Sequence, residues 1–127
     1  MIDYGVPDKR GATERLMKGY TALIERDFTS GRPMAVYARA LGVTPTHLSR
    51  VCRQASGLTA ADMLTERNLH AARDLLEDGE IPIGQIAAML GFGSAAYFSR
   101  FVLQHTGLSP SALRAKSAER APRAISA

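Results

Sequence analysis

The stretch LGVTPTHLSR at residues 41–50 returns in altered form as LGFGSAAYFSR at residues 90–100. The two Leu-Gly pairs lie 49 positions apart, whereas the two Ser-Arg pairs lie 50 positions apart. The second copy has therefore gained one residue in its turn. A repeat of this kind indicates that the chain builds the same structural unit twice.

Each copy carries the signature of a helix-turn-helix. A small residue, Ala38 or Ala87, stands four positions before a glycine, Gly42 or Gly91. Glycine can take the positive φ of a tight turn between two helices. One such pattern is common among helical hairpins, but two copies in register predict a tandem helix-turn-helix protein.

Apolar residues recur with helical spacing through nearly the whole sequence, and no stretch alternates as a strand would. We therefore expect an all-α fold. Thr13 and Thr44 are the expected N-caps of the first and third helices, and Thr59 with Asp62 resembles a capping box. The expected helices lie at residues 13–28, 34–41, 45–55, 59–78, 83–90 and 94–106, and a short last helix is capped by Ser109-Pro110.

These elements predict one folded domain between flexible ends. The domain is expected at residues 13–117, and the segments 1–12 and 118–127 are expected to be flexible. Within the domain, motifs at about 34–55 and about 83–106 flank a linker helix at about 59–78.

The composition bounds the class of protein. Sixteen lysine and arginine residues against twelve aspartate and glutamate residues give the 127-residue chain a formal charge of +4. A basic surplus favours a polyanionic partner. No apolar run nears the ~18 residues that span a bilayer, and no cationic leader precedes an apolar stretch, so we expect a cytoplasmic protein without membrane contact. The single cysteine agrees with a reducing compartment.

The helix that follows the first turn has an apolar face and a polar face. The apolar face comprises Leu48, Val51, Cys52 and Ala55, and the opposite face comprises Thr46, Ser49, Arg50 and Arg53. Arginine can contact guanine O6 and N7 together, so this helix can enter a major groove. An ordinary solvated helix face is the alternative that the pattern leaves open.

The charges are unevenly distributed along the chain. No acidic residue occurs between Asp27 and Asp62 or between Glu80 and Glu119, so phosphate would meet no like charge at either motif. The basic residues there are Arg32, Arg39, Arg50 and Arg53, then Arg100, Arg114 and Lys116. A linker of about twenty residues measures roughly 30 Å, near the ~34 Å of one DNA turn. Two motifs so joined could read successive major-groove segments without a dimer.

With these motifs the sequence resembles the DNA-binding domain of the AraC/XylS family of bacterial transcription regulators. The matching stretches are LGVTPTHLSRVCRQASGLT, ERNLHAARDLL, IGQIAAMLGFGSAAYFSRFVLQHTGLSP and SALR. The resemblance implies seven helices, with two recognition helices joined by a rigid linker helix. It also implies double-stranded DNA and RNA polymerase as partners, and no cofactor.

The resemblance also implies which residues bind DNA. The base-reading positions of the family fall on Thr46, His47, Ser49 and Arg50 in the first motif, and on Ser94, Ala95, Ala96, Ser99 and Arg100 in the second. Arg53 is the expected phosphate contact. Tyr97 could reach a phosphate, although packing is favoured. Leu103 stands at the position that matches Arg53, so the second motif is poorer in phosphate contacts.

Family members usually join this domain to an effector-binding or dimerisation domain, which this sequence does not contain. We expect either a stand-alone regulator or the end of a longer one. The DNA-binding domain is expected to be monomeric unless such a domain is attached.

Other kinds of chemistry find little support in the sequence. Cys52 is expected to pack in the core, and His47, His70 and His105 lack metal-ligand spacing, so no metal site is expected. No nucleophile with a base, paired carboxylates or phosphate loop is evident, so we do not expect an enzyme. A helical protein-interaction module without DNA specificity remains the alternative function.

Overall fold

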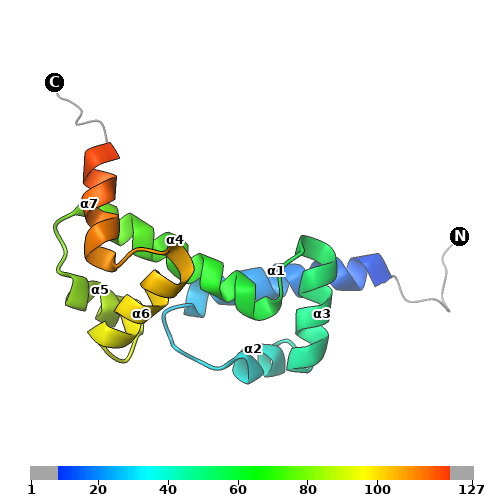
Figure 1. The fold of residues 1–127 in the computed structure, drawn as a ribbon. Coiled ribbons are helices and arrows are strands. Elements are labelled where there is room, and N and C mark those ends of the chain that lie inside the picture. Colours follow the sequence, from blue (N-terminus) through cyan, green and yellow to red (C-terminus); the bar gives the residue numbers. More distant parts are fainter. Residues whose placement is uncertain (1–8, 121–127) are drawn as a thin grey trace, which may run out of the picture. The chain divides into compact units, whose positions relative to one another are not determined.

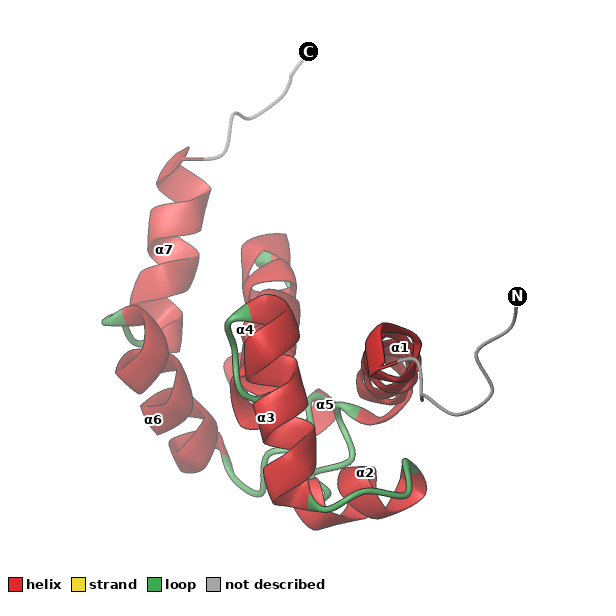
Figure 2. Cartoon of the chain, turned by 90° about the vertical axis from the view of Figure 1, so that its right-hand side faces the viewer, coloured by secondary structure: helices red, strands yellow, loops and turns green. Residues whose placement is uncertain are grey.

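The computed structural model describes residues 9–120 of the chain. This part consists of helices and loops and contains no strand (Figures 1 and 2). The helices are α1 (Lys9–Asp27), α2 (Met34–Ala40), α3 (Pro45–Ser56), α4 (Ala60–Asp78), α5 (Ile83–Met89), α6 (Ala95–Thr106) and α7 (Pro110–Arg120). The predictions of an all-α fold and of seven helices are confirmed.

The ends of the helical region extend beyond the predicted bounds. α1 begins at Lys9, so Thr13 lies inside the helix and its prediction as an N-cap is wrong. Residues 9–12, with the sequence KRGA, include good helix formers and no proline, so nothing in them stops the helix. Residues 9–12 and 118–120, which were expected to be flexible, are helical. The rest of both expected tails lies outside the described residues.

The chain divides into two compact units, residues 9–28 with 32–66 and residues 29–31 with 67–120. In the first unit, α1 and α2 both pack against α3. The hydroxyl of the buried Tyr20 donates a hydrogen bond of 2.6 Å to the carbonyl of Ala60. The core of this unit comprises Tyr20, Ile24, Tyr37, Ala38, Leu48, Cys52 and Ala60.

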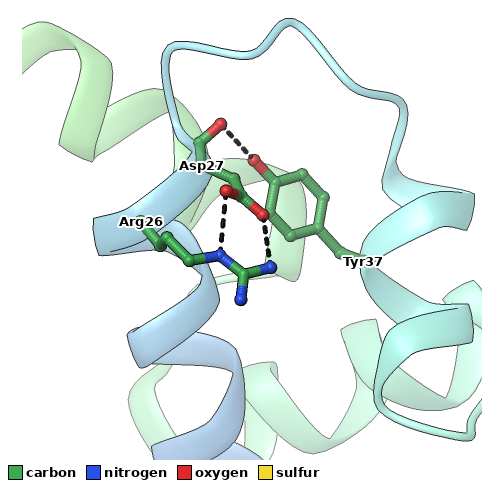
Figure 3. Close-up of polar contacts among 3 residues, drawn as sticks. All are labelled: Arg26, Asp27 and Tyr37. Carbon is green, nitrogen blue, oxygen red and sulfur yellow. Dashed lines mark hydrogen bonds and ion pairs between the residues drawn. The ribbon is translucent and has the colours of Figure 1, made fainter.

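A hydrogen bond from Tyr37 connects α2 to the end of α1 (Figure 3). Its hydroxyl donates a hydrogen bond of 3.0 Å to the carbonyl of Asp27, the last residue of α1. The Arg26 guanidinium donates to both carboxylate oxygens of Asp27, at 3.0 and 2.9 Å, and holds the pKa of Asp27 below its ordinary value. A carboxylate at a helix C-terminus is unfavourable, because the exposed carbonyls there carry partial negative charge. The adjacent Arg26 offsets that repulsion.

The second unit has its own apolar core, in which α6 contacts both α5 and α7. Its buried residues include Leu69, Ala72, Leu76, Ile86, Ala87, Leu90, Phe98 and Val102.

Arg114 of α7 closes the C-terminal end of α4. Its guanidinium donates to the carbonyls of Leu76 at 2.9 Å, Ile81 at 2.6 Å and Leu75 at 3.4 Å. The last carbonyls of a helix have no partners within it, and a cation there also complements the helix dipole. The sequence places Arg114 among the basic residues near the second motif, but its donors go to the backbone. The Arg114 guanidinium therefore has a structural role in the second unit, where it binds backbone carbonyls.

Both turns end their first helix in the same way. In each, the glycine N–H and the next N–H donate back to the last turn of the helix, the pattern of a Schellman motif. These bonds are Gly42 to Arg39 and Val43 to Ala38, each 3.0 Å, and Gly91 to Ala88 at 3.1 Å and Phe92 to Ala87 at 3.0 Å. The glycines have φ of 74° and 83°, so the prediction of a positive φ is confirmed.

The structure also locates the extra residue of the second turn. Only Val43 separates Gly42 from the N-cap Thr44, whereas two residues, Phe92 and Gly93, separate Gly91 from its N-cap, Ser94. Both turns therefore share the glycine and the cap and differ only in the link between them.

The repeat continues beyond α3 and α6. Ser56 Oγ donates to the carbonyl four residues earlier at 2.7 Å and accepts from the Leu58 N–H at 3.2 Å. Thr106 Oγ1 makes the same two bonds at 2.7 and 3.1 Å. Thr59 and Asp62 exchange the two hydrogen bonds of the predicted capping box, and Ser109 caps α7 as expected.

We expect Gly91→Ala to destabilise the protein far more than Gly42→Ala. Both positions have a positive φ, which costs a residue with a Cβ about 1–2 kcal/mol. A Cβ at Gly91 would also overlap the backbone carbonyl of Thr29, whereas a Cβ at Gly42 meets no atom within 4 Å. The free energy of unfolding from chemical denaturation measures both losses. Equal losses would show that the carbonyl of Thr29 moves aside without cost.

We expect Arg114→Met to destabilise the protein by about 2 kcal/mol, because a charged donor to three backbone carbonyls is lost while the aliphatic stem is kept. Lys116→Met is the matched control, since Lys116 lies exposed on the same helix. Denaturation curves of the two variants make the comparison. A loss no larger than that of the control would contradict the role given to Arg114.

Candidate nucleic-acid interface

α3 begins where its sequence places a cap. Thr44 Oγ1 accepts the N–H of His47 at 3.1 Å, and Pro45 occupies the first helical position, where no N–H is needed. The helix ends at Gly57, which has a φ of 85°. The predicted start of this helix is therefore confirmed, and the cap determines which residues form its first turn.

The inner face of α3 is largely as predicted. Leu48, Val51 and Cys52 are buried in the first unit. Ala55 was expected on the same face, but it is exposed and borders an open groove along α1. The prediction is wrong at Ala55 because the groove between this residue and α1 is open to solvent.

The outer face of α3 carries the predicted DNA-binding residues of the first motif. Thr46, His47, Arg50 and Arg53 are exposed, and Ser49 is half-buried. Within residues 9–120, neither the Arg50 nor the Arg53 guanidinium has a hydrogen-bond or ion-pair partner. Two unpaired cations on one exposed helix face provide donors for a phosphate or a base edge.

α6 is built as a second version of α3. Ser94 Oγ accepts the N–H of Tyr97 at 3.0 Å, as Thr44 does for His47. The oxygen of Ser94 is thus the N-cap acceptor of α6, and its expected contact with a base stays a prediction. The 50-residue offset that pairs Ser94 with Thr44 was the signal that could have indicated this role.

The inner faces of α3 and α6 match residue by residue. Phe98 and Val102 have no solvent-exposed surface, and neither do Leu48 and Cys52 at the matching positions. Burial also raises the pKa of the Cys52 thiol, which disfavours a reactive thiolate. The expectation that Cys52 belongs to the core is confirmed.

The outer face of α6 is less polar than that of α3. Ala95, Ala96 and Arg100 are exposed, and Ser99 is half-buried. Arg100 has no hydrogen-bond or ion-pair partner in the described part of the chain. The exposed fraction of Leu103, which replaces the Arg53 of the first motif, is 51%.

An aromatic cluster supports the start of α6. The ring of Phe92, in the turn, lies 5.4 Å from that of Tyr97, 5.1 Å from that of Phe98 and 4.9 Å from that of Phe101. Such edge-on and tilted pairs are favourable for aromatic rings. Tyr97 therefore packs, as expected, yet 53% of its surface is exposed. Sequence reasoning missed Phe92 because its partners lie on the following helix.

Other kinds of site are poorly represented in residues 9–120. No three His, Cys, Asp or Glu side chains there are grouped so that they could hold a metal ion. None of the helices described is both long and apolar enough to cross a membrane. His70 and Asp74 form an exposed pair at 3.5 Å on α4.

Comparison with known proteins gives a family for this arrangement. A family model described as a helix-turn-helix domain matches residues 37–116, which include both turns and the helices α3 and α6. The chain is 32% identical over 117 residues to the HTH-type transcriptional regulator GlxA of Rhizobium meliloti. It is 31% identical over 87 residues to the arabinose operon regulatory protein of Escherichia coli.

A crystal structure of a transcriptional regulator from Chromobacterium violaceum, described with AraC-type DNA-binding domain-containing proteins, has the same fold. The TM-score is 0.72 at 25% identity, and the match covers 87% of this chain and 99% of that one.

The chain belongs to the AraC/XylS family of helix-turn-helix transcription regulators. Its matches cover 87% and 68% of this chain but only 36% of GlxA and 30% of the arabinose regulator. The chain therefore spans about a third of the length of these family members. The shared part is the DNA-binding region.

Proposed function

We propose that this chain binds promoter DNA sequence-specifically, with α3 and α6 as the recognition helices in two major-groove segments. The observation that carries the proposal is the repeated unit: each helix starts at a hydroxyl cap and exposes, at the same position, an arginine that has no partner among residues 9–120, Arg50 or Arg100. The absence of acidic residues from 28–61 and 81–118 supports a polyanionic partner.

The DNA-binding set divides by chemistry. Thr46, His47, Ser49 and Arg50 on α3, with Ala95, Ala96, Ser99 and Arg100 on α6, are proposed to face base edges. Arg53 lies in the last turn of α3 and is proposed to contact a phosphate, and Tyr97 is proposed to do so on α6. Ser94 is proposed to position the first turn of α6 toward DNA through its cap.

The remaining partners follow from the family. We propose that the bound protein contacts RNA polymerase, since its relatives regulate transcription. Its role is binding and not catalysis, and its DNA-binding region acts as a monomer. Two recognition helices on one chain provide two groove contacts without a second copy.

We expect Arg50→Ala to cost about 1–3 kcal/mol in binding to a specific site and to relax the preference at one base pair, because a bidentate guanine contact is lost. Arg53→Ala should weaken binding to specific and random DNA alike. It should also reduce the slope of log affinity against log salt concentration by about one unit, because one phosphate contact is lost. Titrations of labelled duplexes at several salt concentrations measure both effects.

The two arginine variants provide each other's control, because both residues are exposed cations on one helix. Identical losses on specific and random DNA would contradict the division into base-reading and phosphate-contacting residues. Binding that does not weaken with salt would exclude the DNA-binding function itself.

We expect binding to depend on the distance between the two half-sites. α4 runs without a break for 19 residues, which is roughly 28 Å at ~1.5 Å per residue. If α4 is a rigid spacer between helices one DNA turn apart, inserting about five base pairs between the half-sites should reduce affinity to that of one motif. Equal affinity for normal and expanded sites would mean that a single motif carries recognition.

A flexible spacer should change this response. Glu66 and His70 are exposed on α4, and glycine at both costs about 1 kcal/mol of helix stability per site. The double-glycine variant should bind the normal site more weakly and lose less on the expanded site. The matched control has alanine at both positions, which keeps the helix and should behave like the unmodified protein.

A further inference from the structure

The outer faces of the two recognition helices differ in hydrogen-bonding capacity. At matching positions, α3 presents Pro45, Thr46, His47, Ser49, Arg50 and Arg53, whereas α6 presents Ala95, Ala96, Tyr97, Ser99, Arg100 and Leu103. α3 thus offers polar side chains at five of these positions. α6 offers them at three, and the serine of each helix, Ser49 or Ser99, is half-buried.

The difference is greatest in the first turn of α6. The N-terminal residues of a recognition helix are those that meet base edges. In α6 these are Ala95 and Ala96, which are exposed and carry only methyl groups. Ser94 Oγ accepts the Tyr97 N–H at 3.0 Å, which holds this hydroxyl at the cap while its O–H can still donate. A base edge that meets Ala95 or Ala96 finds apolar surface.

Only one base presents an apolar group in the major groove of unmodified DNA. Thymine carries a C5-methyl group there, and alanine is among the side chains that contact it. A guanine or an adenine opposite the same alanines would lose water from its acceptors or donors without gaining a partner. The pairing of Ala95 and Ala96 with thymine therefore follows from the chemistry of the surface.

We propose that α6 selects thymine through contact of Ala95 and Ala96 with C5-methyl groups, while Arg100 supplies the main polar contact of this half-site. The proposal rests on the DNA-binding function proposed above. It makes the DNA site asymmetric, with arginine-read guanine under α3 and thymine under α6.

The charge around these alanines favours DNA over a protein as the occupant of this face. Arg100 is exposed without a hydrogen-bond or ion-pair partner within the described residues, and no acidic residue occurs between Glu80 and Glu119. An apolar turn next to an unpaired cation complements a methyl-bearing base edge beside phosphate. Arg50 occupies the position in α3 that matches Arg100 in α6, so each helix has an arginine at the same distance from its cap.

The experiment removes the methyl group and nothing else. Binding sites are first selected from random duplexes with the full chain, and the half-site of α3 is identified by the position that Arg50→Ala relaxes. Each thymine of the other half-site is then replaced by deoxyuridine, which pairs identically but lacks the C5-methyl. We expect a loss of about fourfold in affinity for each contacted methyl.

Ala96→Gly tests whether the penalty belongs to this side chain. It removes the Ala96 methyl group, so the deoxyuridine penalty at the thymine that Ala96 contacts should fall to near onefold, while the penalty at the thymine that Ala95 contacts should remain. Thr46→Gly, at the matching position of α3, is the control and should leave the penalty in the α6 half-site unchanged. Thermal unfolding of both variants verifies that they are folded.

The outcomes separate the two proposals. Selected sites with thymine in the α6 half and a methyl-dependent affinity support the inference. Specific sites without thymine there, or with affinity that deoxyuridine leaves unchanged, overturn it and leave the DNA-binding function intact. If selection yields no preferred sequence and binding is insensitive to salt, both proposals fail and this face is a protein-docking surface.

Discussion

A left-handed glycine turn followed closely by a hydroxyl cap determines how each recognition helix is presented. Gly42 and Gly91 end their helices with two backbone hydrogen bonds, and Thr44 and Ser94 open the next helices two and three residues later. The chain between these points has little conformational freedom. Because one residue corresponds to about 100° of helix rotation, a start displaced by one position would turn a different face outward. The outward position of Arg50 and Arg100 follows from this constraint.

Five arginines of the chain fall into two structural classes. Arg26 neutralises a carboxylate at the end of α1, and Arg114 satisfies three carbonyls at the end of α4. Arg50, Arg53 and Arg100 are exposed on the recognition helices and make no hydrogen bond or ion pair within residues 9–120. Net charge alone does not separate these groups. The cations proposed to bind DNA are those that are paired neither with a carboxylate nor with the carbonyls at a helix end.

The two motifs keep a common interior and have diverged on the surface. Leu48 and Phe98 occupy the same buried position, and the larger ring of Phe98 is accommodated beside Phe92 in the longer second turn. On the outside, Leu103 stands at the position of Arg53, and Ala96 stands at the position of Thr46. Packing constrains the interior of each unit, whereas the outer face is constrained only by what it contacts. The pattern of divergence is therefore that of two helices that present one geometry to two different surfaces.

The sequence by itself determined the elements whose signals are local. The caps at Thr44 and Thr59, the turns at Gly42 and Gly91 and the buried face around Cys52 all follow from residues within about one or two helical turns of one another. For the same reason the exposed face of α3, including Arg50, could be predicted from helical spacing alone. The start of α1 also depends on local sequence, but Thr13 was wrongly predicted as its N-cap.

Only the tertiary structure decided the contacts between distant segments. The Tyr20 hydroxyl reaches a carbonyl 40 positions away, Arg114 reaches one 38 positions away, and Thr29 lies against Gly91. Helical spacing states which side of a helix is apolar, but not which helix covers it or where that cover ends. Ala55 is exposed because an open groove separates it from α1, and Arg114 is structural because α7 places it at the end of α4. Such roles depend on the packing of whole helices, which no short stretch of sequence contains.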